Sequence, residues 1–129
     1  MRPNEISYNV IGAAMAVHSA LGAGLLESAY EKALCHEFTR MKLQYGRQVA
    51  LPVDYQGAKL TTAYRIDLVV ENSVVVEVKA LERILPVHRA QLLSYLKLSK
   101  LPLGLLLNFK VVHLRDGICR LINAPENEL

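Results

Sequence analysis

Three charged residues in a valine-rich stretch have the types and the spacing of a site for a divalent metal ion. Asp67 lies in the first of two apolar runs, and Glu77 and Lys79 lie in the second. Two carboxylates about 4 Å apart repel each other by roughly 1 to 4 kcal/mol at effective dielectric constants between those of water and of a protein surface. A divalent cation bound by their hard oxygen atoms would offset that repulsion, with the lysine beside it. We therefore hypothesise a metal site at these three residues.

The same spacing also fits a hairpin without a chemical role. Charges on one face of neighbouring strands often pair harmlessly or point to water at the edge of a sheet. On spacing alone, an edge hairpin with solvated charges, or a simple ion pair between Glu77 and Lys79, explains these residues as well as a metal site does.

Two strands joined by a turn at residues 71–73 are predicted to carry the charged residues, because β-branched runs flank a polar break there. Side chains alternate along a strand, so Arg65 and Asp67 should share one face. Glu77 and Lys79 should likewise share one face of the following strand. The charges then project from a mostly buried hairpin.

An earlier strand is predicted from the alternating pattern of residues 45–55, with Pro52 favouring an edge position. Gln56 and Gly57 indicate the turn that leads back toward Tyr64. We therefore expect three or more consecutive antiparallel strands in this part of the chain.

Two helices are predicted before these strands, separated by a glycine break at residues 22–24. The first begins at Glu5 with Asn4 as its cap, and the second runs from residue 25 or 26 to Met41. Together they should form a helical hairpin. The expected buried stripes are Ile6, Val10, Ala13, Ala14, Val17 and Leu21 in the first helix and Leu26, Tyr30, Ala33, Leu34 and Phe38 in the second.

A third helix is predicted at residues 87–98, with Pro86 in its first turn. Its inward side chains should be Ala90, Leu92, Leu93 and Leu96, whereas His88, Gln91 and Tyr95 line one polar face. Residues 102–109 then read as a buried strand. A final hairpin pairs residues 111–114 with 118–122 through a turn at Asp116 and Gly117, and residues 124–129 form a polar tail.

Length and composition are those of one globular domain spanning residues 1–129, since 52% of the residues are hydrophobic and 21% are charged. The predicted elements give an α/β (α+β) fold, a mixed sheet with helices packed on its faces and an N-terminal helical hairpin. The net charge of +3 is compatible with an anionic partner. Cys35 and Cys119 are expected to be free thiols, and without a signal peptide or a membrane span we expect a cytoplasmic protein with no membrane partner.

Several motifs in this order resemble one family. Residues 24–30, GLLESAY, match the signature of the GxxExxY proteins, and residues 64–68, 77–80, 88–96 and 104–109 are also similar to that family. The resemblance covers about residues 5–123. It implies the PD-(D/E)xK nuclease-like superfamily, its RecB-like branch with a Q-x-x-x-Y motif, and therefore a restriction-endonuclease-like fold.

The resemblance also implies roles for individual residues. Asp67 and Glu77, with the Val78 carbonyl, would bind Mg²⁺ or Mn²⁺, and Lys79 would be the motif lysine. Glu27 would supply an extra acid from the second helix that completes the metal shell or accepts a proton. Gln91 and Tyr95 would support the site from the third helix. The remaining candidates are substrate-binding residues, Arg65, His88 and Arg89. Several of these residues also have an explanation without a functional role. An acid such as Glu27 is common at any helix start, a helical tyrosine such as Tyr95 is commonly part of a core, and His88 and the two arginines could be solvated surface residues.

The resemblance implies a metal-dependent nuclease that hydrolyses phosphodiester bonds of DNA or RNA with a metal-activated water. The alternative is a nucleic-acid-binding or protein-interaction module that keeps the nuclease fold without turnover. Hydrolysis of another phosphate ester is a third hypothesis, although the chain has no glycine-rich P-loop. A homodimer is also hypothesised, because a small domain has little surface for gripping a duplex and two sites would suit cutting both strands.

Overall fold

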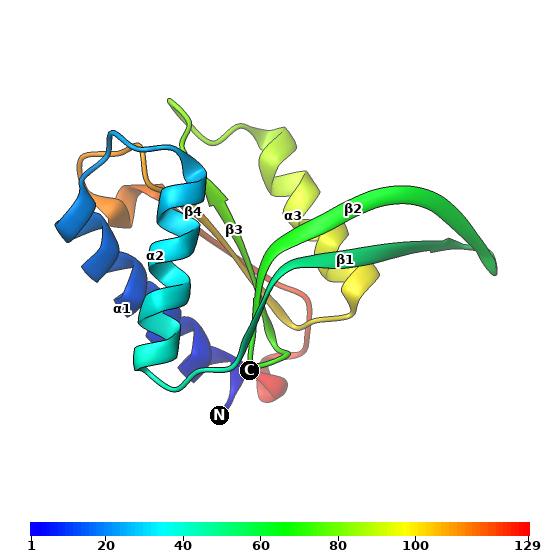
Figure 1. The fold of residues 1–129 in the computed structure, drawn as a ribbon. Helices are drawn as coiled ribbons and strands as arrows, with labels where there is room; N and C mark the ends of the chain where they lie inside the picture. The colour runs from blue at the N-terminus through cyan, green and yellow to red at the C-terminus, as the bar shows by residue number, and fades with distance from the viewer.

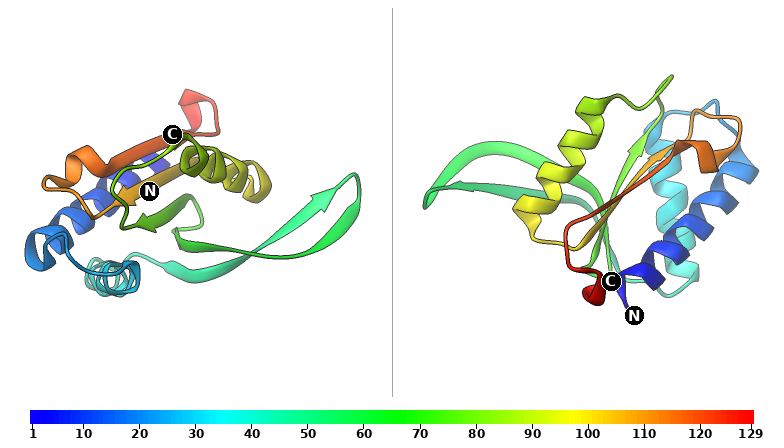
Figure 2. Two further views of the ribbon diagram at one scale, coloured as in Figure 1. Left: turned by 90° about the horizontal axis from the view of Figure 1, so that it is seen from above. Right: turned by 180° about the vertical axis from the view of Figure 1, so that it is seen from behind.

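The computed structural model describes residues 1–129, except for the side chain of Thr62. A five-stranded sheet in the order β1-β2-β3-β4-β5 lies at its centre, with β3 and β4 parallel and the other neighbours antiparallel. Helices α1 and α2 cover one face of the sheet and α3 covers the other (Figures 1 and 2). The elements are α1 (Pro3–Leu21), α2 (Glu27–Arg40), β1 (Tyr45–Tyr55), β2 (Ala58–Val70), β3 (Val74–Lys79), α3 (Pro86–Ser99), β4 (Leu103–Asn108) and β5 (Ile118–Ile122), with short 3₁₀ helices η1 (Leu114–Gly117) and η2 (Glu126–Glu128).

The mixed sheet flanked by helices confirms the predicted fold class, including the N-terminal helical hairpin. The three consecutive antiparallel strands, β1 to β3, are also as predicted. β1 is an edge strand, and the register of its pairing with β2 shifts at Pro52, which has no N–H to donate to a ladder. Cys35 and Cys119 are both free and buried.

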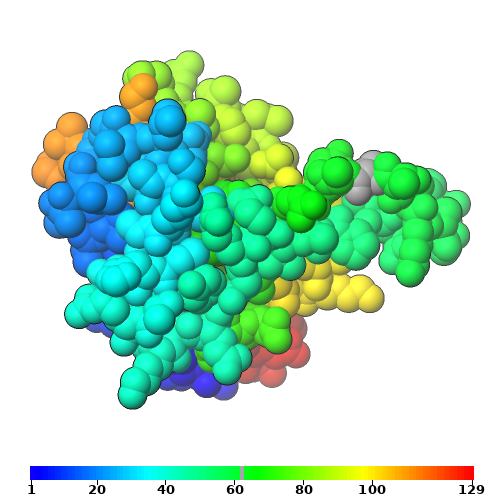
Figure 3. All heavy atoms as spheres, in the orientation of Figure 1, coloured from blue at the N-terminus to red at the C-terminus, as the bar shows by residue number. Residues whose placement is uncertain are grey.

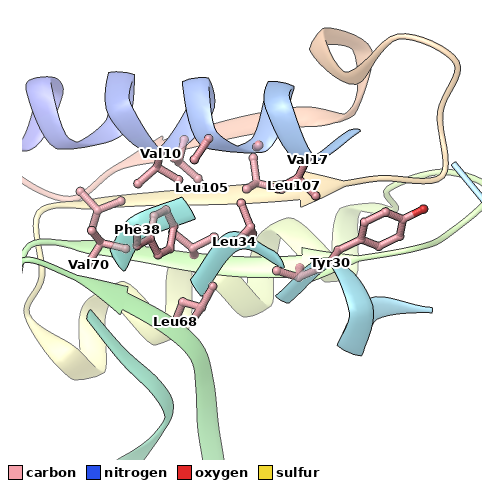
Figure 4. Close-up of a cluster of buried hydrophobic side chains, with 14 of the residues drawn as sticks. Val10, Val17, Tyr30, Leu34, Phe38, Leu68, Val70, Leu105 and Leu107 are labelled. Atoms are coloured by element: carbon pink, nitrogen blue, oxygen red, sulfur yellow. The ribbon is translucent and has the colours of Figure 1, made fainter. Parts of the chain in front are cut away.

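The larger core lies between the helical hairpin and the sheet (Figure 4). It is built from the predicted stripes of both helices and from alternate residues of the central strands, because period 3.6 in a helix and period 2 in a strand each present one apolar side. A smaller core joins α3 to the opposite face of the sheet. The fully buried side chains of the larger core include Val10, Tyr30, Leu34, Phe38, Leu68, Val70, Leu105 and Leu107.

Several helix predictions were wrong in detail. α1 begins at Pro3 rather than after an Asn4 cap, because proline is well suited to the first turn of a helix. Leu21 and Leu26 flank the glycine break and are exposed, since the chain leaves the helical stripe there. Ala90 and Leu93 of α3 are also exposed, because α3 packs through Leu92, Tyr95 and Leu96 instead.

The predicted C-terminal hairpin was also wrong. Residues 111–113 form bends, η1 follows, and β5 pairs directly with β4. Gly117 is needed because a Cβ atom there would collide with the backbone carbonyl of Asn108, so this glycine permits a close approach rather than a two-residue hairpin turn. The end of the chain is not merely polar: Leu129 is buried and its carbonyl accepts a hydrogen bond from Asn4 N at 2.9 Å.

Tyr30, the tyrosine of the GLLESAY signature, has a structural role in the core. Its hydroxyl donates to the Gly22 carbonyl at 2.6 Å and accepts from Leu25 N at 3.0 Å. Its ring stacks on Phe109, just after β4, with the ring centroids 4.4 Å apart. This one side chain therefore fixes the glycine turn between α1 and α2 against the end of β4.

We expect Tyr30→Phe to lower the free energy of unfolding by about 1 to 2 kcal/mol, because the stacking remains while two backbone groups lose their hydroxyl partner. Urea denaturation followed by circular dichroism measures the change. Tyr8→Phe is the matched control, since Tyr8 is 79% exposed. Equal midpoints for the two variants would contradict the role given to the hydroxyl.

β1 and β2 continue beyond the sheet as a two-stranded arm (Figures 1 and 3). β3 pairs only with residues 68–70 of β2, so the rest of that long strand has β1 as its neighbour. Asp67 lies at the first position beyond the paired segment, at the base of the arm.

Candidate active site

The paired acids lie where β2 and β3 separate. The regular ladder ends at Leu68 opposite Val76. Beyond it, Asp67 N donates to Glu77 Oε2 at 2.7 Å, and Val78 N donates to Asp67 Oδ2 at 2.9 Å. Each carboxylate thus satisfies a backbone N–H that a longer ladder would have paired. This reciprocal arrangement positions both acids at one point of divergence.

Burial makes ionisation of both acids unfavourable. Glu77 is only 4% exposed, and burial, followed by repulsion from Asp67, raises its pKa from 4.5 to about 8. Burial also raises the pKa of Asp67, with the charge of Glu31 adding to the effect, while the Val78 N–H and the Lys79 ammonium oppose it. Near neutral pH, the pair therefore holds a proton unless another positive charge replaces it.

Lys79 is the last residue of β3 and is the predicted basic residue whose charge acts on the paired acids. Its charge lowers the pKa of both Asp67 and Glu77. Its backbone carbonyl accepts from Phe109 N at 2.9 Å, which fixes the end of β3 beside the end of β4. The structure therefore brings together three of the predicted residues.

Glu31 is an acid of the site that sequence reasoning missed. It is 5% exposed, and its Oε1 accepts from Arg47 Nε at 3.2 Å and Gln48 Nε2 at 2.9 Å. Its charge raises the pKa of both Asp67 and Glu77. A signal was available, because Glu31 lies three and seven residues before Leu34 and Phe38 and so occupies the buried stripe of its helix, where an acid needs a partner.

Glu27 occupies the first turn of α2, one turn before Glu31, and is partly buried. Among the described residues, it has no hydrogen bond or ion pair with either acid of the pair. The described residues also contain no group of three or more His, Cys, Asp or Glu side chains that could hold a metal ion. The structure therefore does not gather Glu27, Asp67 and Glu77 into one ligand cluster.

α3 contributes Tyr95 to the surroundings of the paired acids. Tyr95 is 7% exposed, and burial and the charges of Glu77 and Asp67 raise the pKa of its phenol. Its ring meets Tyr64 of the arm edge to face, with centroids 6.4 Å apart. Gln91, one turn earlier, is exposed.

The three predicted substrate-binding residues lie in different settings. His88 Nδ1 accepts from Leu85 N at 2.9 Å, so this histidine caps the start of α3. Arg89 is exposed on α3. Arg65 is exposed on β2, and its Nη1 donates to the Gln48 carbonyl at 3.4 Å, two residues from Asp67.

The oxygen atoms at the divergence of β2 and β3 fit a hard divalent cation. Asp67 and Glu77 each accept a backbone N–H with one carboxylate oxygen. The other oxygen of Asp67 has a 3.4 Å contact with Gln48 Nε2 and keeps a lone pair for a cation. The N–H and C=O of one strand residue point to the same edge, so the Val78 carbonyl faces the edge on which its N–H meets Asp67. Two carboxylates and a carbonyl are donors that Mg²⁺ or Mn²⁺ accepts.

A mixed sheet between an N-terminal helical hairpin and a third helix, with paired acids and a lysine at its diverging strands, defines a restriction-endonuclease-like domain. Residues 4–121 match the family model of the PD-(D/E)XK nuclease superfamily, and the chain belongs to this superfamily. Comparisons with curated proteins and with solved structures give no match. None of the described helices is long and apolar enough to cross a membrane.

Proposed function

We propose that this protein is a metal-dependent nuclease that hydrolyses phosphodiester bonds of DNA or RNA as one domain of residues 1–129. The observation that carries the proposal is the pair formed by half-buried Asp67 and buried Glu77, each of which accepts a backbone N–H from the other strand and lies within the influence of the Lys79 charge. Such a pair is costly in a protein that does not use it, since its charges lie in a poorly solvated position. The GLLESAY signature supports assignment to the GxxExxY branch.

Asp67, Glu77 and the Val78 carbonyl would hold Mg²⁺ or Mn²⁺. A bound ion of this kind supplies Lewis-acid polarisation of a phosphate and a water of lowered pKa. Lys79 orients the attacking water or stabilises the negative charge that develops on the phosphate. Glu27 is proposed as a proton acceptor from the start of α2, one turn before Glu31, which is the acid of that helix whose charge acts on the pair.

The outer residues bind and orient the substrate in this proposal. Gln91 and Tyr95 approach from α3, and Arg65, His88 and Arg89 meet phosphate oxygens. A second copy of the chain would add a second site for cutting both strands. Light scattering at micromolar concentration tests this hypothesis, and a monomer would contradict it.

The proposed activity is tested by incubating the protein with mixed DNA and RNA substrates in Mg²⁺, in Mn²⁺ and in EDTA. We expect cleavage only with a divalent ion, and a loss of about 10- to 100-fold in Lys79→Met, because that substitution removes the charge that aids the transition state. Lys97→Met is the matched control, since Lys97 is an exposed lysine on α3. Metal binding without cleavage of any substrate would instead favour a nucleic-acid-binding module on the same fold.

A further inference from the structure

Gln48 has a left-handed backbone conformation inside a strand. Its φ is +51°, whereas the residues on either side keep regular register with β2, Arg47 opposite Leu68 and Val49 opposite Ile66. This conformation is uncommon for a residue with a side chain. The other described non-glycine residues with positive φ lie in turns or at helix ends: Lys42, Gln56, Glu71, Asn72 and Lys100.

The unusual conformation changes the direction of the side chain. Consecutive side chains of a regular strand point to opposite faces. Arg47 and Gln48 nevertheless both donate to Glu31 Oε1, at 3.2 and 2.9 Å. The positive φ breaks the alternation and puts two consecutive side chains on the same side of the sheet, facing α2.

The redirected amide also reaches Asp67. Gln48 Nε2 lies 3.4 Å from Asp67 Oδ1, while Val78 N donates to Asp67 Oδ2 at 2.9 Å. Gln48 thus contacts the one oxygen of Asp67 that the backbone does not hold. A neutral amide can stand between Asp67 and Glu31 and donate to both without bringing a charge to the site.

We propose that Gln48 is a positioning residue, whose left-handed backbone conformation turns its amide so that it orients the free oxygen of Asp67 beside Glu31. The role in catalysis rests on the proposed nuclease function, but the orientation of Asp67 does not. Residues that orient the ligands of a metal site are typically worth 10- to 100-fold in activity or metal affinity. An unfavourable backbone conformation retained at such a place is consistent with a functional constraint.

Two substitutions at Gln48 and one matched control test the proposal. Gln48→Gly accepts the positive φ but has no amide, and Gln48→Met keeps the length of the side chain but donates no hydrogen bond. The control is Gln56→Gly, because Gln56 has φ +50° but lies in the turn at the tip of the arm. Glycine relieves the backbone equally at both positions.

The readouts are kcat and KM for cleavage and the hydrogen-exchange rate of the Val78 amide, which reports its bond to Asp67 without requiring activity. We expect both Gln48 variants to lose about 10- to 100-fold in kcat with little change in KM, and Val78 exchange to quicken about tenfold. Gln56→Gly should match the wild type in both. Wild-type kcat and wild-type Val78 exchange in the Gln48 variants would overturn the proposal. Faster Val78 exchange only in the Gln48 variants, with no cleavage by any protein, would support the orienting role and overturn the nuclease function.

Discussion

Glu77→Gln is expected to stabilise the metal-free protein at pH 8 while it abolishes cleavage. Because the pKa of Glu77 is raised from 4.5 to about 8, the folded protein keeps a proton that the unfolded chain releases. The contribution of Glu77 to the free energy of unfolding is therefore fully present below about pH 4.5. It falls as the pH rises toward 8, because the unfolded state then binds fewer protons than the folded state. The loss between pH 5 and pH 8 should be roughly 3 kcal/mol.

Glutamine removes this pH dependence because it does not titrate, and its amide oxygen can still accept from Asp67 N. Guanidinium denaturation in EDTA at pH 5, 6.5 and 8 measures the effect, and a shallower slope in Glu77→Gln than in the wild type is the expected result. Glu126→Gln is the control, since Glu126 is exposed near the C-terminus. Parallel pH profiles for the wild type and Glu77→Gln would show that Glu77 is ionised normally.

Asp67→Asn is expected to lower cleavage by about 10³-fold or more, because in the proposed mechanism it removes a negative ligand of the metal ion that activates the water. The fold should survive, since the asparagine amide oxygen can still accept from Val78 N. The charge of Asp67 raises the pKa of Glu77, so its removal should lower that pKa and shift the loss of stability to a lower pH range.

Asp54→Asn is the matched control, because Asp54 is an exposed aspartate of the arm. Cleavage rates and Mn²⁺ binding by calorimetry are compared for the two variants and the wild type. We expect Mn²⁺ binding to be lost only in Asp67→Asn. Equal cleavage by the two variants would remove Asp67 from the site and with it the basis of the proposed function.

Short-range features of the chain were predictable because local rules decide them. The short turn at residues 71–73 sets the register of β2 and β3, so Asp67 and Glu77 had to come close if both strands formed. The stripes of α1 and α2 were largely correct for the same reason, except at helix ends, where Leu21 and Leu26 leave the stripe. In α3, two of the four residues predicted to face inward, Ala90 and Leu93, are exposed. The C-terminal segment failed because β5 pairs with β4 across η1, and a glycine that allows a close approach has the same sequence signal as a glycine in a hairpin turn.

The sequence by itself determined the pairing of Asp67 with Glu77 and Lys79, because alternation along two adjacent strands needs no knowledge of the rest of the molecule. Only the tertiary structure decided which acid of α2 approaches that pair. Glu27 and Glu31 are one turn apart and share a helix face, so the choice depends on how α2 docks against β1. The tertiary structure also decided the direction of the Gln48 side chain, because a positive φ reverses the direction that strand alternation predicts. It decided the high pKa of Glu77 as well, because desolvation depends on every element packed around the carboxylate.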